Sequence, residues 1–110
     1  MTMNEAIKAG EVFCLADLID YRDGEIVHMD LAGNEHMKVA MKAFDAGKEL
    51  AAHTAPGDVI VFALEGEAVI NCDGKDHPIK AGENFHFAKG NTHAVKAKTK
   101  YKMAFVVVFD

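Results

Sequence analysis

The glycines in the second half of the chain recur at nearly constant intervals. They stand at positions 47, 57, 66, 74, 82 and 90, and short runs of Val, Ile, Phe and Ala lie between them. Short strands that alternate with turn residues roughly every 8 to 12 positions are typical of β-sandwiches and β-barrels. The glycine spacing therefore predicts an all-β fold and leaves little room for helices.

The runs between the turn signals predict seven strands in one domain. The expected strands are residues 25–31, 37–44, 59–64, 67–72, 84–88, 92–97 and 101–109. Gly66 and Gly74 supply the positive φ angles that tight turns between strands need. A length of 110 residues fits a single domain, which we divide into an N-terminal lead-in over residues 1–24 and a barrel over residues 25–110. Only residues 3–9 have weak helical character.

Composition narrows the range of functions. The chain has 17 acidic and 12 basic residues, a single arginine, no serine and no long apolar run. An acidic chain with one arginine is poorly suited to binding nucleic acid. The lack of serine excludes catalysis by a serine nucleophile. No apolar stretch is long enough for a transmembrane helix. Two cysteines without a C-x-x-C motif, and an N-terminus without a signal-peptide pattern, favour a cytoplasmic protein.

Alternation along two strands indicates which side chains point inward. In residues 37–43 the odd positions are apolar and include Met41, whereas the even positions include Lys38 and Lys42. His93 shares the apolar face of its own strand. We therefore expect Met41 and His93 to face the interior and the two lysines to face water.

Two of the expected strands lack a polar face altogether. Residues 59–64 and 103–109 are apolar on both sides. A strand that is buried on both faces in a small barrel needs a cover. A second copy of the chain would provide that cover, so we expect a homodimer. The N-terminal 20 residues are the alternative cover.

Two histidines stand at fixed distances from glycines. Gly47 is followed after five residues by His53, and Gly82 is followed after ten residues by His93. These spacings, over residues 47–97, resemble the two motifs of the cupin superfamily of small β-barrels. The resemblance implies a double-stranded β-helix, the cupin or jelly-roll type of barrel.

The resemblance also implies a degenerate metal site. In metal-binding cupins a His-x-His pair, a glutamate and the histidine of the second motif hold one divalent metal. His53 and His93 match two of these ligands, whereas Ala55 and Val59 stand where the other histidine and the glutamate would be. What remains of the motif is a two-histidine site, His53 and His93, for one divalent transition metal.

A metal enzyme of this kind needs a third ligand from the protein. Asp58 lies beside the lost glutamate position but needs a bulge to turn inward, and His86 falls on the outer face of its strand by alternation. His28 and Glu49 are further candidates, which only the tertiary fold could bring to the pocket. Three more candidates have a soft sulfur atom: Cys72, Met41 and Met103.

We predict a barrel that binds a small molecule in a mostly apolar cavity lined by His53, His93, Val59 and Met41. One alternative is a metal-dependent enzyme of dioxygenase, isomerase or decarboxylase type that acts on a small polar organic substrate. A second is acid–base catalysis by His53 and His93 without a metal, because histidine titrates near neutral pH. A third is a structural dimer module with a filled interior. The sequence assigns no catalytic residue.

Overall fold

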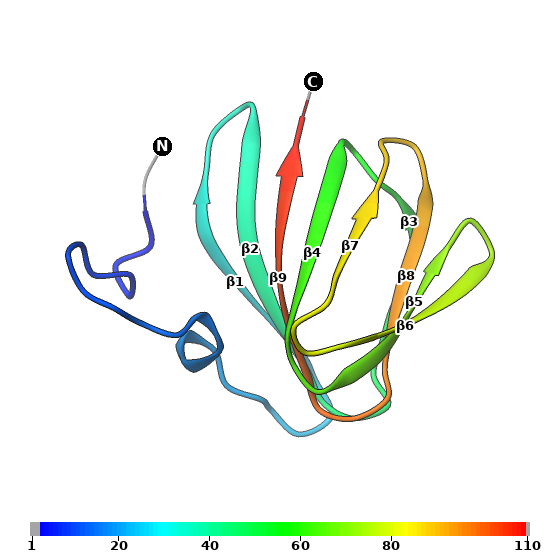
Figure 1. The fold of residues 1–110 in the computed structure, drawn as a ribbon, viewed down its shortest axis with the longest axis horizontal. Helices are drawn as coiled ribbons and strands as arrows, with labels where there is room; N and C mark the ends of the chain where they lie inside the picture. Colours follow the sequence, from blue (N-terminus) through cyan, green and yellow to red (C-terminus); the bar gives the residue numbers. More distant parts are fainter. Residues whose placement is uncertain (1–2, 110) are drawn as a thin grey trace.

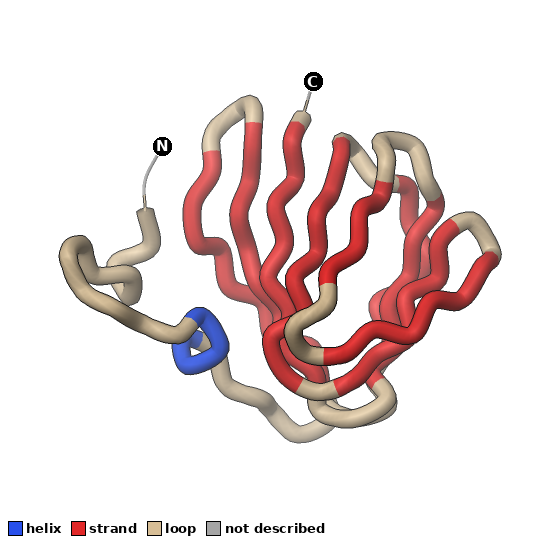
Figure 2. The backbone as a smooth tube through the Cα atoms, in the orientation of Figure 1, coloured by secondary structure: helices blue, strands red, loops and turns tan. Residues whose placement is uncertain are grey.

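Nearly all regular structure in this protein is β-strand. The computed structural model describes residues 3–109. Its strands are β1 (Ile26–Gly33), β2 (Met37–Phe44), β3 (Glu49–Thr54), β4 (Asp58–Glu65), β5 (Glu67–Cys72), β6 (Lys75–Lys80), β7 (Asn84–Phe87), β8 (Thr92–Ala97) and β9 (Tyr101–Val108). The one helical element of the described chain is a short 3-10 helix, η1 (Leu15–Leu18), in the N-terminal segment (Figure 2). No helix among the described residues is long and apolar enough to cross a membrane.

The strands form two antiparallel sheets that face each other. The five-stranded sheet has the order β1-β2-β9-β4-β7, and the four-stranded sheet has the order β3-β8-β5-β6. The two sheets lie close together at one end of the molecule and splay apart at the other (Figure 1). The predicted all-β double-stranded β-helix is confirmed, although the described strands remain two sheets and do not close into a continuous barrel.

Two strands and the helix differ from the sequence-based expectation. β3 and β6 were not predicted, and they form the two edges of the four-stranded sheet. Their residues are mostly exposed, so they lack the apolar alternation by which strands are recognised. β6 also contains Pro78, a residue that sheets tolerate at edges. Residues 3–9 form turns, and the helix lies further along at η1.

The main hydrophobic core lies between the two sheets. Its largest fully buried side chains are Phe44, Ile70, Phe87, Val95 and Tyr101. They come from both sheets, and the ring of Phe44 meets the ring of Tyr101 edge-on, with centroids 5.6 Å apart. Contact between aromatic rings in this geometry is favourable beyond the area it buries. This core joins the two sheets.

A second apolar cluster covers the outer face of the five-stranded sheet. Met41, Ala43 and Ala104 contribute from the sheet, and Ile19 is buried against them from the N-terminal segment. Ile7, Leu15 and Leu18, all from that segment, pack against the cluster. The N-terminal segment therefore supplies cover for the outer face, which is the alternative that the sequence left open.

A buried lysine fixes this cover to the sheet. Lys102 on β9 is 6% exposed, and its Nζ donates a hydrogen bond of 2.7 Å to the backbone oxygen of Ala16. The same Nζ lies 3.6 Å from a carboxylate oxygen of Glu65 and 4.9 Å from the ring centroid of Tyr21. Tyr21 in turn donates a 2.7 Å hydrogen bond to Glu65. The charge of Lys102 is thus balanced by direct contacts, as a buried charge requires.

Part of the outer face stays uncovered. Ile60, Phe62 and Val108, from β4 and β9, are exposed large apolar side chains. Ile60 pairs with Val106, and Asp58 pairs with Val108, so these positions are neighbours across the two strands. The homodimer therefore stays a prediction, and this strip is the part of the sheet that a second copy would have to cover.

The β4–β5 turn depends on a residue without a side chain. Gly66 has a φ of +76°, and a Cβ atom there would collide with the backbone oxygen of Lys100. Gly74, in the β5–β6 turn, has a similar φ of +85° but open space around it. Alanine variants of these two glycines therefore separate the free-energy cost of the backbone angle from the free-energy cost of the collision.

We expect Gly66→Ala to destabilise the protein much more than Gly74→Ala. The unfavourable φ angle costs about 1 kcal/mol in both variants, and the collision in Gly66→Ala raises its cost to about 3 kcal/mol or more. Urea unfolding curves measure both values. Equal losses in the two variants would contradict the close approach of Lys100.

Candidate functional site

A cavity of about 340 Å³ lies between the two sheets. Its apolar lining residues come mainly from the strands of both sheets: Leu50, Val59, Val61, Phe87, Val95, Met103, Phe105, Val107 and Phe109. Its polar lining residues are His28, Lys38, Lys42, His53, Thr54 and His93. The volume falls at the lower end of the range for small-molecule sites, roughly 300 to 1,000 Å³. The cavity is therefore large enough for a small organic molecule.

A β-bulge in β3 directs His53 into this cavity. Leu50 pairs with Val95 on β8. Three positions further along β3, His53 pairs with His93, which is only two positions away from Val95. Without the extra residue Leu50 and His53 would lie on opposite faces of the sheet. The bulge brings both to the inner face, and both line the cavity.

His53 and His93 form a contacting pair on the four-stranded sheet. Their ring centroids are 3.9 Å apart at an interplanar angle of 67°. His93 is only 7% exposed and also packs on the ring of Phe87, with centroids 4.3 Å apart. Nδ1 of His93 is buried without a hydrogen-bond partner among the described residues, whereas Nδ1 of His53 lies 3.0 Å from the backbone oxygen of Ala51.

Burial decides the protonation state of His93. Removal from water, with a smaller contribution from the neighbouring His53, lowers the pKa of His93 from 6.5 to about 4. His93 is therefore neutral at pH 7. Its place on the inward face of β8 agrees with the sequence-based expectation.

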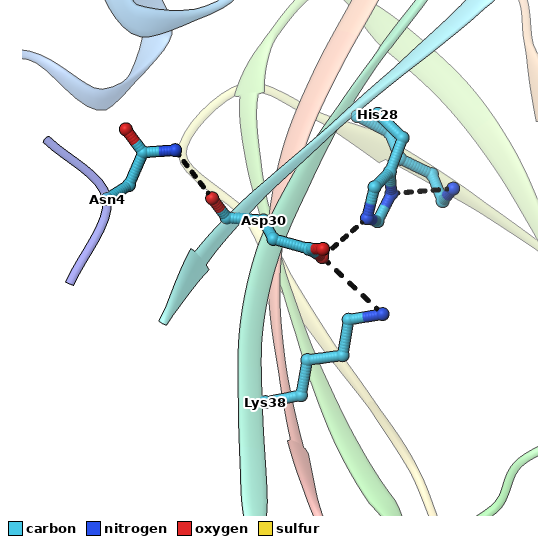
Figure 3. A network of polar contacts seen from close by, with 5 residues as sticks. Asn4, His28, Asp30 and Lys38 are labelled. Atoms are coloured by element: carbon cyan, nitrogen blue, oxygen red, sulfur yellow. Dashed lines mark hydrogen bonds and ion pairs between the residues drawn. The ribbon is translucent and has the colours of Figure 1, made fainter. Parts of the chain in front are cut away.

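A second polar group lies on the opposite sheet, at β1 and β2. Nζ of Lys42 lies 3.1 Å from Nδ1 of His28, and Nε2 of His28 lies 2.7 Å from Oδ1 of Asp30. Lys38 reaches the same carboxylate oxygen at 3.5 Å. Figure 3 shows how His28 and Lys38 converge on Asp30, and how Asn4 of the N-terminal segment donates a 2.8 Å hydrogen bond to the backbone oxygen of Asp30. The four side chains from His28 to Lys42 form a continuous polar chain.

The environment shifts the pKa values of two members of this chain. Desolvation lowers the pKa of the Lys42 ammonium, and the nearby charge of Lys38 lowers it further, while Asp30 acts in the opposite direction. The hydrogen bond from His28 lowers the pKa of the Asp30 carboxyl, with a smaller contribution from Lys38. Asp30 is therefore ionised near neutral pH, and Lys42 gives up its proton more readily than an exposed lysine does.

The structure reverses the expected orientation of β2. Met41 is fully buried in the outer cluster beneath the N-terminal segment, and it is not among the residues that line the cavity. Lys38 and Lys42, expected to face water, line the cavity instead. The alternation itself is as predicted, but the N-terminal segment gives the methionine face an apolar partner. Val59, His53 and His93 do line the cavity.

Neither expected third metal ligand lies near the two histidines. Asp58 and His86 are exposed on the outer side of β4 and β7, with 3.7 Å between an Asp58 carboxylate oxygen and Nε2 of His86. Asp58 also accepts a 3.0 Å hydrogen bond from the backbone N–H of Lys89. Neither residue lines the cavity. Alternation placed His86 outside, and the bulge that Asp58 needed is not formed.

The donor set of the described residues does not fit a catalytic metal. Cys72 pairs with His93 across β5 and β8, yet the described chain contains no group of three His, Cys, Asp or Glu side chains that could hold a metal ion. Met103 lines the cavity but Met41 does not. Two imidazoles alone fall short of the three protein ligands that catalytic sites usually have.

The sequence model of the cupin domain family matches residues 40–109, and the chain belongs to that family. The resemblance seen in the sequence is thereby confirmed. A comparison with curated protein sequences finds no match.

Solved structures of cupins share the fold over most or all of the chain. A cupin superfamily protein from Desulfitobacterium hafniense superposes with a TM-score of 0.93 at 23% identity, with both chains covered completely. A cupin 2 conserved barrel domain protein from Leptotrichia buccalis is 35% identical over 87% of this chain and 47% of its own, with a TM-score of 0.84. A predicted oxalate decarboxylase from Thermotoga maritima gives 0.72 at 26% identity, covering 79% of this chain and 83% of its own.

The lowered pKa of His93 predicts a loss of stability in acid. As the pH falls from 6.5 to about 4, His93 becomes protonated in the unfolded chain but stays neutral in the folded protein. The free energy of unfolding should therefore fall by up to about 3 kcal/mol over this range because of His93 alone. His93→Leu should remove this part of the slope, and His36→Leu, a change at an exposed histidine, should leave it. Urea unfolding as a function of pH measures the slopes; identical slopes in wild type and His93→Leu would refute the assignment.

Proposed function

We propose that the protein binds a small organic anion with an apolar body in the cavity between its sheets. The observation that supports this most directly is the charge of the lining. Two lysines, Lys38 and Lys42, line the cavity, and none of the described lining residues carries a carboxylate. The chain as a whole has a net charge of −5, so the cavity is basic in an acidic protein. A concave surface of one charge attracts ligands of the opposite charge.

Lys42 is the cation most available to a ligand. Lys38 is partly neutralised by its ion pair with Asp30 at 3.5 Å. Among the described residues Lys42 has no ion pair with a carboxylate; its close partner is Nδ1 of His28. A half-buried ammonium without a carboxylate partner gains from an anionic ligand, because the ligand replaces the water that the ammonium has lost.

The rest of the lining defines the body of the ligand. Phe87, Phe105 and Phe109 offer aromatic surface, and Val59 and Val107 offer aliphatic surface. A ligand that consisted of charge alone would leave this surface in contact with water. A small carboxylate with an aromatic or branched apolar part fits both portions of the lining.

One of the similar structures has a description that names a small organic anion. The Thermotoga maritima protein is described as a predicted oxalate decarboxylase, and oxalate is a small organic dianion. Oxalate has the carboxylate groups of the proposed ligand and lacks its apolar part, so this similarity supports only the anionic portion of the proposal.

Benzoate binding tests the proposal against a neutral isostere. We expect the wild-type protein to bind benzoate and to bind benzamide much more weakly, as measured by isothermal titration calorimetry. Lys38→Gln/Lys42→Gln should weaken benzoate binding about 100-fold or more, because each charge-assisted hydrogen bond contributes about 1.5–3 kcal/mol and the double variant removes two. The matched control is Lys89→Gln/Lys96→Gln, which changes the net charge equally at exposed residues outside the cavity lining. Equal losses in the two double variants would contradict a specific site.

The metal-dependent enzyme is the alternative with less support, because the described residues supply no third ligand beside His53 and His93. We expect protein that has been incubated with manganese, iron, zinc, nickel or copper and then dialysed to retain well below one metal per chain, as measured by inductively coupled plasma mass spectrometry. The variant His53→Ala/His93→Ala should retain the same small amount. One equivalent in the wild type that disappears in this variant would replace our proposal with the metal-dependent one.

A further inference from the structure

The polar chain at β1 and β2 has the arrangement of an activated nucleophile. Lys42 Nζ lines the cavity, His28 Nδ1 lies within hydrogen-bond reach of it at 3.1 Å, and Asp30 holds the other ring nitrogen of His28 at 2.7 Å. A nucleophile beside a base, with the base oriented by a third group, is the arrangement by which proteins activate weak nucleophiles. This chain lies on the sheet opposite to His53 and His93, so it is independent of the family's metal positions.

The geometry specifies how a proton can move along this chain. A charged lysine has only donors, so Lys42 donates to Nδ1, and the Nε2–H of His28 donates to Asp30. If the proton passes from Lys42 to Nδ1, the imidazolium stays hydrogen-bonded to the neutral amine on one side and to the carboxylate on the other. The heavy atoms need not move, because both protonation states use the same two contacts. Asp30 stabilises the second state through its negative charge.

We propose that Lys42 is a nucleophilic lysine that forms a Schiff base with a small carbonyl compound that carries a carboxylate. This inference rests on the proposed function, because the carboxylate is recognised by the basic lining. Lys38 lies on the same strand and face as Lys42 and provides a second cation for that carboxylate. The apolar residues around the amine favour its neutral form, which is the reactive one.

The reaction balances with the groups present. His28 Nδ1 first takes a proton from the Lys42 ammonium. The lone pair of the neutral amine then adds to the carbonyl carbon, the C=O π pair moves to oxygen, and proton transfer from nitrogen to oxygen gives a carbinolamine. His28 returns its proton to the hydroxyl group, which leaves as water while the nitrogen lone pair forms the C=N bond. The sum is ammonium plus carbonyl giving iminium plus water, and no oxidant or reductant takes part.

Reductive trapping with glyoxylate, a small anionic aldehyde, tests this proposal. The protein is incubated with glyoxylate and sodium cyanoborohydride, and the labelled lysines are mapped by peptide mass spectrometry. We expect Lys42 to be labelled at least about tenfold faster than the exposed lysines Lys89 and Lys96 in the same sample. His28→Leu should lower the rate at Lys42 by about 100-fold, the lower end of what a positioned base contributes.

The rate of labelling at Lys42 and the affinity for benzoate, both measured on the wild-type protein, separate this inference from the proposed function. Lys89→Arg, a change at an exposed residue outside the cavity lining, should alter neither value. Labelling of Lys42 at the rate of Lys89, with benzoate binding intact, would overturn the nucleophile and leave the binding function standing. If the wild-type protein does not bind benzoate but Lys42 is labelled rapidly, the binding function is wrong, and so is the claim that the carboxylate is recognised.

Discussion

The cover that the N-terminal segment provides for the five-stranded sheet determines which side of β2 faces the cavity. Ile19, Leu15 and Leu18 pack against the outer cluster that contains Met41. Because Met41 finds its apolar surroundings there, the other face of the strand, with Lys38 and Lys42, points between the sheets. The buried contacts of Lys102 with Ala16 and Glu65 hold the segment in place. The chemistry of the cavity thus depends on packing on the far side of the sheet.

The cavity combines two polar groups of different character. His53 and His93 on one sheet are the remnant of the family's metal positions, and burial keeps His93 neutral. The chain from Lys42 to Asp30 on the other sheet carries the charge. Ala55 and Val59 stand at two of the four metal-ligand positions that the family resemblance implies, and the basic groups of β1 and β2 line the same cavity. In our proposal these basic groups would hold the anion, and the apolar lining would hold the rest of the ligand.

The sequence predicted the fold much better than the site. The glycine spacing and the two histidine motifs were sufficient for the family and for seven of the strands, because turns and apolar runs are local signals. β3 and β6 could not be predicted from the sequence, because these exposed edge strands lack an alternation of apolar and polar residues. His53 reaches the cavity through a bulge that strict alternation does not foresee. The orientation of β2, and with it the roles of Lys38, Lys42 and Met41, depends on a distant segment, which no local pattern reveals.

Methionine methyl groups allow the central claim to be tested directly. Met103 lines the cavity, whereas Met41 lies in the outer cluster on the opposite side of the same sheet. In protein labelled with ¹³C at the methionine methyl groups, titration with benzoate should shift the Met103 signal in a saturable manner and leave the Met41 signal unchanged. Shifts at Met41 without shifts at Met103, or no saturable shift at either, would contradict the anion-binding cavity that we propose.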